Sequence, residues 1–154
     1  MEQRLAQEKI AATVINASIS GDTTSGGRAR LPALLAKHQP TVVIIELGGN
    51  DALRGLPLTM TQDNLQAMTQ AAQATKAKVL LLGMQMPPNY GQDYGARFAA
   101  LYATVAKASK TGLVPFLLKD VADTQFQNDR IHPTEAAHPT MLNNVWPALK
   151  KQLS

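Results

Sequence analysis

The chain has no cysteine among its 154 residues. Without thiols it can form neither disulfides nor thiolate metal sites, so its stability must come from a packed core. No apolar run is long enough to span a membrane, and charged residues make up only 17% of the chain. Apolar residues reach 45%, which is typical of a globular protein and not of a disordered one.

The excess of basic over acidic residues is small, with 15 Lys and Arg against 11 Asp and Glu. The charges are scattered, and no basic stripe carries interleaved aromatic residues. We therefore expect no nucleic acid among the partners. The first residues are polar and lack the apolar segment of a signal peptide, so the chain as written is predicted to be cytoplasmic.

Short apolar or β-branched runs alternate with longer segments that carry apolar residues at helical spacing. The runs predicted to be strands are 11–17, 41–47, 78–84 and 113–117. The segments predicted to be helices are 28–38, 61–76, 94–110 and 134–153. This alternation predicts an α/β fold in which helices cover both faces of a parallel sheet. Because the sequence has no repeat and no linker, we expect a single domain over residues 1–154.

Polar, often glycine-rich stretches follow the predicted strands, at the ends where parallel sheets bind ligands. Asp129 precedes His132 by three residues after the last strand. At this spacing the carboxylate can accept the imidazole Nδ1–H and leave Nε2 free as a base. A surface turn that happens to contain both residue types would have the same spacing.

Two earlier stretches can supply hydrogen-bond donors. In 48–51, the carboxamide of Asn50 can donate to a developing oxyanion. In 20–23, Gly21 has no side chain, so its backbone N–H can approach a substrate closely. Each stretch is also compatible with a turn chosen only for its backbone geometry, with Asp22 or Thr23 as a helix N-cap.

Taken together and in this order, these stretches resemble the SGNH (GDSL-like) hydrolase family, in the branch of bacterial thioesterase I/lysophospholipase L1 and the related arylesterases. The matching stretches are 14–23, 30–35, 46–51, 53–55, 88–91 and 129–133. The resemblance implies a three-layer α/β/α, flavodoxin-like fold. It also implies hydrolysis of a small acyl ester or thioester through an acyl-serine intermediate. The sequence has no metal-ligand cluster and no phosphate-binding loop, so we expect neither metal nor cofactor.

The resemblance also assigns roles to individual residues. His132 is implied as the general base and Asp129 as the acid that orients it. Gly21 and Asn50 are implied as the oxyanion donors, through the backbone and the side chain respectively. The residues implied in the acyl channel are Met86 and Pro87.

The nucleophile of this family is missing from the sequence. In the family it lies in a Gly-Asp-Ser block after the first strand, whereas the only Gly-Asp here is Gly21-Asp22, followed by Thr23. We expect the first strand and the serine block to lie upstream of Met1. The chain is then N-terminally truncated, catalytically impaired and most simply explained by a mis-started reading frame. Ser20, beside the implied oxyanion glycine, is a weaker candidate for a substitute.

In the flavodoxin-like strand order, the absent strand would lie between two strands that are present. We therefore expect unpaired apolar edges, low stability and non-native self-association through those edges. Two other functions stay open. One is a catalytically inactive remnant, or pseudo-hydrolase, that binds acyl ligands or a partner chain. The other is a carbohydrate deacetylase, although 53–55 and 89–91 favour the thioesterase and arylesterase branch. Relatives in this branch are often periplasmic or secreted, which leaves the location of the full-length protein open.

Overall fold

A computed structural model describes all of residues 1–154. Its sheet has three parallel strands in the order β1 (Val42–Ile45), β2 (Lys78–Leu82) and β3 (Gly112–Val114). The α-helices are α1 (Glu2–Gln7), α2 (Thr24–His38), α3 (Gly49–Leu53), α4 (Leu58–Ala74), α5 (Gln92–Ser109) and α6 (His138–Gln152). The 3-10 helices are η1 (Pro88–Tyr90), η2 (Asp123–Gln125) and η3 (Glu135–Ala137).

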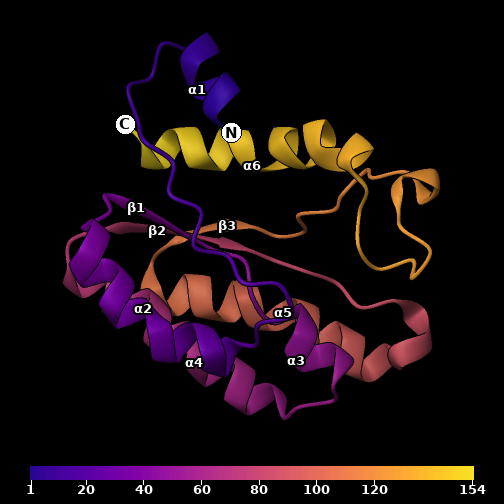
Figure 1. Cartoon of the computed structure of the whole chain (residues 1–154). Coiled ribbons are helices and arrows are strands. Elements are labelled where there is room, and N and C mark those ends of the chain that lie inside the picture. The colour runs from indigo at the N-terminus through magenta and orange to yellow at the C-terminus, as the bar shows by residue number, and fades with distance from the viewer.

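Helices cover both faces of the sheet, with α1 and α6 on one side and α2, α4 and α5 on the other (Figure 1). Leu80 and Leu82 of β2 pack with Trp146 of α6, whereas Val79 and Leu81 pack in the cluster beneath the opposite helices. Successive side chains of a strand point to opposite faces, so a strand covered on both faces must be apolar throughout. The predicted three-layer α/β/α fold is confirmed.

Most predicted elements form, with shifted ends. The helix predicted from residue 28 begins at Thr24 because the Thr23 side chain accepts a hydrogen bond from the Gly26 amide and caps the helix. The three predicted strands of the sheet are shorter than their apolar runs. The stretch 48–51, which was compatible with a turn, enters the short helix α3 at Gly49.

The strand predicted at 11–17 is absent, and that prediction is wrong. The segment has no regular secondary structure, and none of its backbone groups hydrogen-bonds another backbone group. Its β-branched residues are exposed, with Val14 at 36% and Ile15 at 50%. A β-strand is defined by backbone hydrogen bonds to a neighbouring strand. β-branched residues favour strands, but they cannot provide that neighbouring strand. β1 is likewise paired on one side only, by β2, and its Ile44 is 38% exposed.

Contacts with α6 hold the start of the chain in place. Leu5 of α1 is buried among the residues of the α6 cluster. The Arg4 guanidinium lies 5.4 Å from the centre of the Trp146 ring, a distance at which a cation and an aromatic face attract each other. The Trp146 indole N–H donates to the Glu8 carboxylate at 3.1 Å. The segment that follows therefore leaves from a fixed point above the sheet.

Candidate active site

The loop after β3 is built around one carboxylate. Asp129 Oδ1 accepts hydrogen bonds from the backbone N–H groups of Ile131 and His132, at 2.9 and 3.0 Å. The Gln127 amide donates to the His132 carbonyl at 2.7 Å and closes the loop. Within it, Arg130 adopts a left-handed φ of 59°. These contacts hold the two predicted side chains, Asp129 and His132, on the same short turn.

The second oxygen of Asp129 faces the imidazole, with 2.6 Å between Oδ2 and His132 Nδ1. This hydrogen bond, together with the two backbone donors, lowers the pKa of Asp129 to about 2. The carboxylate is therefore ionised at neutral pH and selects the tautomer with the proton on Nδ1. Nε2 is left free to accept a proton, and the His132 side chain is 62% exposed.

Asn50 lies in the first turn of α3, directly after β1. Its Nδ2 donates to the Asp22 carbonyl oxygen at 3.0 Å, which fixes the orientation of the amide because Oδ1 cannot donate. One Nδ2–H therefore remains available. The approach to Asn50 requires glycine, since Gly48 has a φ of 118° and a Cβ there would lie 2.3 Å from the Tyr102 hydroxyl.

Gly21 lies in the turn that precedes α2, with a φ of 78° and open space where a Cβ would be. The turn closes when the Asp22 amide donates to the Ile19 carbonyl at 3.2 Å. No protein atom accepts from the Gly21 N–H, whereas its carbonyl accepts from Arg54 at 3.4 Å. Asp22 directly follows Gly21, so the hydrogen bond from Asn50 to Asp22 holds the two predicted oxyanion donors in the same part of the structure.

Arg30 stabilises the other side of this turn. Its Nε donates to the Asp22 carboxylate at 2.8 Å, and its Nη1 donates to the Ala17 carbonyl. The Arg30 and Asp22 side chains are only 27% and 12% exposed. A charge-assisted hydrogen bond in partly dry surroundings holds a loop more firmly than an exposed ion pair does. The 20–22 turn is therefore tied to α2 as well as to α3.

A buried carboxylate lies beneath both donors. Asp51 has no exposed surface, and it accepts hydrogen bonds from the Thr24 amide, the Thr24 hydroxyl and the Thr61 hydroxyl. Asn64 adds a donor to the Thr24 hydroxyl at 3.1 Å. The sequence did not identify these partners, which come from α2 and α4. The network joins the helix that follows Gly21 to the helix that contains Asn50.

Glu46 is a further ionisable group that sequence reasoning missed. It follows β1, and part of its side chain is exposed at the unpaired edge. Surrounding protein atoms nevertheless desolvate its carboxyl and raise its pKa, while the charge of His132 acts in the opposite direction. The charge of His132, which follows β3 in the chain, therefore acts on a carboxyl group that follows β1. Only the three-dimensional fold could reveal this interaction.

Met86 and Pro87 follow β2 at the same end of the sheet, and both are half-buried. Met86 packs against the cluster beneath α4 and α5. Nearby, the Tyr94 hydroxyl of α5 donates to the Leu56 carbonyl at 3.0 Å. A role of Met86 and Pro87 in an acyl channel stays a prediction.

No serine hydroxyl hydrogen-bonds His132 in this structure. The Ser25 hydroxyl accepts from Asn64, and Ser20 lies exposed beside Gly21. A base, its orienting acid and two potential oxyanion donors are therefore present without a paired nucleophile. Substitution by Ser20 stays untested.

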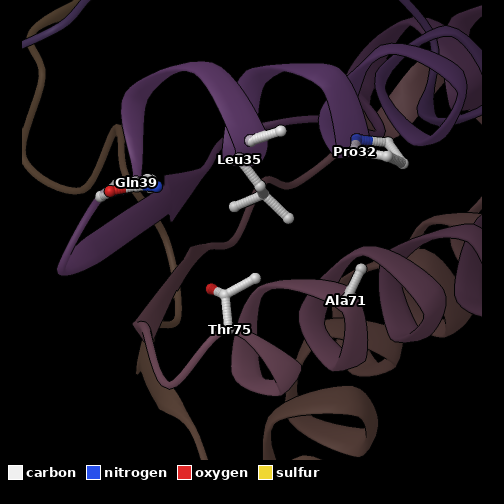
Figure 2. Close-up of a pocket in the computed structure, with 7 residues that line it drawn as sticks. Pro32, Leu35, Gln39, Ala71 and Thr75 are labelled. Carbon is white, nitrogen blue, oxygen red and sulfur yellow. The ribbon is translucent and has the colours of Figure 1, made fainter.

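A surface hollow of about 560 Å³ lies elsewhere. Pro32, Leu35 and Gln39 line it from the end of α2, and Ala71 and Thr75 from the end of α4 (Figure 2). It therefore opens at the end where β1 begins, opposite to His132 and Asn50. It contains no ionisable side chain.

No group of three or more His, Asp or Glu side chains could hold a metal ion, and none of the helices combines the length and apolarity needed to cross a membrane.

Residues 1–139 match the GDSL-like Lipase/Acylhydrolase family. The chain is 55% identical to the esterase TesA of Pseudomonas aeruginosa, over 99% of this chain and 77% of that protein. It is 45% identical to the thioesterase 1/protease 1/lysophospholipase L1 of Escherichia coli, over 82% of this chain but only 62% of the relative.

A crystal structure of TesA superimposes on 98% of this chain with a TM-score of 0.96 and 54% sequence identity. The aligned part is 85% of that chain. The solved structure therefore has the same arrangement of elements, together with residues that have no counterpart here.

Proposed function

The chain belongs to the GDSL-like lipase/acylhydrolase family, and we propose that its site hydrolyses carboxylic esters or thioesters through an acyl-serine intermediate. The observation that carries this proposal is the 2.6 Å contact between Asp129 and His132. The sequence has no Gly-Asp-Ser block, and we propose that a strand outside these residues supplies the serine. A carbohydrate deacetylase stays an alternative, and a comparison of acetylated sugars with aryl esters as substrates tests it.

His132 acts as the general base. The serine Oγ attacks the carbonyl carbon while His132 Nε2 takes the hydroxyl proton, which it then passes to the leaving alcohol or thiol. Water attacks the acyl-serine in the same way, so that the carboxylic acid leaves and the serine recovers its proton. Asp129 is ionised at neutral pH, and it stabilises the imidazolium that forms in each step.

Gly21 and Asn50 hold the oxyanion. The Gly21 N–H has no protein acceptor, and the second Nδ2–H of Asn50 remains free when the first is bound to Asp22. Two fixed donors stabilise the negative charge of the tetrahedral intermediate without having to reorganise. Removal of one such donor typically slows catalysis about 10²–10³-fold.

The substrate is a small acyl ester or thioester whose acyl group lies along Met86 and Pro87. Both side chains are apolar and half-buried, and they follow β2 at the end of the sheet where Asn50 follows β1. The relatives from Pseudomonas aeruginosa and Escherichia coli are an esterase and a thioesterase/lysophospholipase, which supports esters and thioesters as substrates.

A second candidate function rests on the absence of a paired nucleophile. Without a serine next to His132, residues 1–154 would act as a catalytically inactive protein that binds acyl ligands or a partner chain. We propose that these residues form one domain in both cases.

The unpaired edge of β1, with its exposed Ile44, would also make the isolated domain self-associate. Analytical ultracentrifugation over a range of protein concentrations measures this self-association.

The proposed reaction is tested by fusing a segment with an apolar strand and a Gly-Asp-Ser block upstream of Met1. The fused chain should hydrolyse aryl esters and acyl thioesters faster than acetylated sugars. His132→Ala should reduce the rate about 10³-fold or more, whereas His138→Ala, at an exposed histidine, should not. A rate that survives His132→Ala would reject the mechanism. Preference for acetylated sugars would favour a carbohydrate deacetylase.

A further inference from the structure

Asp22 is the acceptor in three hydrogen bonds within the turn that carries Gly21. Its Oδ2 accepts from Arg30 Nε at 2.8 Å, and its Oδ1 accepts from the Thr23 amide at 2.9 Å. Its backbone carbonyl accepts from Asn50 Nδ2 at 3.0 Å. Asp22 therefore connects the turn to α2 through its side chain and to α3 through its main chain.

Arg30 of α2 holds the turn on both sides of Gly21. Its Nη1 donates to the Ala17 carbonyl, before the glycine, while its Nε donates to Asp22, directly after the glycine. The planar guanidinium carries several N–H donors in a fixed arrangement, so one side chain can bind two acceptors at once. Because most of the surface of both charged side chains is shielded from water, the contact is stronger than an exposed ion pair.

The first turn of α2 is shaped to accept the Asp22 carboxylate. A Cβ at Gly26 would collide with Asp22 Oδ1, so the close approach of the carboxylate requires glycine there. Thr23 contributes to the same arrangement twice, because its amide donates to Asp22 and its hydroxyl accepts from the Gly26 amide. The carboxylate is therefore held between the start of the helix and the Arg30 guanidinium.

We propose that Arg30 positions both oxyanion donors through Asp22, although it hydrogen-bonds neither of them. This role rests on the proposed function of Gly21 and Asn50. Gly21 directly precedes Asp22, so the direction of its N–H depends on where Asp22 is held. The Asn50 amide uses the Asp22 carbonyl as its acceptor, so the direction of its free Nδ2–H depends on Asp22 as well. Donors stabilise an oxyanion most when they already point at it, and a firm hold on Asp22 therefore supports catalysis.

An ion pair with a purely structural role would behave differently. Removal of one partner of a partly buried pair leaves the other charge without compensation, so Arg30→Met should lower stability whichever role the pair has. Only the positioning role also predicts that Gly21 and Asn50 move more freely in molecules that remain folded. It further predicts a lower kcat with little change in KM, because oxyanion donors act mainly in the transition state.

The chain offers a matched control pair on another helix. Arg97 and Asp93 form an ion pair of 3.9 Å on α5, and their side chains are 64% and 90% exposed. Exposed pairs of this kind contribute little to stability. Arg97→Met therefore removes the same side chain and the same charge as Arg30→Met, but it leaves the turn around Gly21 undisturbed.

The first measurement is nitrogen NMR relaxation on the chain of residues 1–154. The Gly21 amide should have an order parameter of about 0.85 in the wild type and below about 0.6 in Arg30→Met, which are the values typical of rigid and flexible backbone. The Asn50 side-chain amide should lose rigidity in parallel. Arg97→Met should leave both groups as they are in the wild type. The amides of β2 should stay rigid in every variant that remains folded.

Two further variants test whether Arg30 acts through Asp22. Arg30→Lys keeps the charge but not the planar group that binds two acceptors, so it should retain part of the rigidity that Arg30→Met loses. It also replaces Arg30→Met in the test if that variant does not fold. Asp22→Asn keeps the backbone carbonyl that binds Asn50 but removes the ion pair. In this background Arg30→Met should have a much smaller effect on Gly21, because the two substitutions remove the same contact and their effects should not add.

The second measurement uses the chain fused to the strand and Gly-Asp-Ser segment. Loss of one oxyanion donor slows catalysis about 10²–10³-fold. Two donors that are present but mobile should have a smaller effect, so we expect Arg30→Met to lower kcat by about 10- to 100-fold. KM should stay close to the wild-type value, and Arg97→Met should change neither constant.

Greater mobility of Gly21 and Asn50 together with a lower kcat supports the positioning role of Arg30. Wild-type rigidity of both groups in folded Arg30→Met overturns it, and so does an unchanged kcat despite greater mobility. An equal effect of Arg97→Met overturns it as well, because the loss of any cation would then suffice. If the fused wild-type chain hydrolyses no ester, the proposed function fails, whereas the relaxation data still decide whether Arg30 holds the two groups in place.

Discussion

Replacement of Asp51 should destabilise the chain more than any other change to a polar side chain at the site. Asp51 is fully buried, and Asp51→Ala would leave the Thr24 amide, the Thr24 hydroxyl and the Thr61 hydroxyl without their acceptor. A hydroxyl can rotate toward another acceptor, but the Thr24 amide cannot. One buried unsatisfied donor costs about 1–3 kcal/mol, and the two hydroxyls also lose hydrogen bonds to a charged group, so we expect a total loss of about 3–5 kcal/mol in the free energy of unfolding.

Asp51→Asn keeps the shape of the side chain and the oxygen that accepts from the Thr24 amide. It removes the charge and places an NH₂ group against two hydroxyls, of which the Thr24 hydroxyl already accepts from Asn64. Hydrogen bonds to a charged group contribute about 1.5–3 kcal/mol, so this variant should lose about 1–3 kcal/mol. The order of stability should be wild type, then Asp51→Asn, then Asp51→Ala.

Urea unfolding followed by circular dichroism gives these free energies, and the exchange rate of the Thr24 amide reports the same network locally. Asp63→Ala serves as the matched control, because Asp63 lies exposed on α4 and should change stability by less than about 0.5 kcal/mol. The reasoning would be refuted if Asp51→Ala lowered stability no more than Asp63→Ala, or if the Thr24 amide exchanged at the wild-type rate.

Three further predictions concern other contacts. The pKa of Asp129 falls from 3.8 to about 2 on folding. Its ionised carboxylate should therefore stabilise the fold above pH 3.8, and this stability should disappear as the pH falls through about 2. An NMR titration of the carboxyl group with a midpoint near 3.8 would contradict this. Tyr102→Phe removes the buried hydrogen bond to the Leu47 carbonyl and should cost about 1–3 kcal/mol in urea unfolding, with unchanged stability as the contrary result. Trp146→Ala should cost about 3–5 kcal/mol and release α1 to proteolysis, whereas a protected α1 would show that Leu5 alone holds it.

The parts of the structure that depend on neighbours in sequence could be predicted. Asp129 and His132 are three residues apart, and the turn that joins them is closed by their own backbone groups. The stripe on α5, from Phe98 to Val105, follows from helical spacing alone and is buried as expected. In both cases the interaction that fixes the structure lies within the predicted segment.

The parts that depend on distant partners could not be predicted. The β-branched segment 11–17 has the composition of a strand, but its state depends on whether a neighbour is present, and none is. The charge interaction between Glu46 and His132 joins residues that follow different strands. The partners of Asp51 come from two helices that only the fold brings together. Sequence patterns indicate which groups are unusual, but not what they contact.

The most direct test of the site is a crystal structure of the chain fused to the strand and Gly-Asp-Ser segment, after a phosphonate ester has reacted with the serine. Such an adduct carries an oxygen where the oxyanion forms. We expect that oxygen about 2.7–3.1 Å from both the Gly21 nitrogen and Asn50 Nδ2, with His132 Nε2 turned toward the serine oxygen. An adduct oxygen that contacts neither donor, or an imidazole directed away from the serine, would contradict the account.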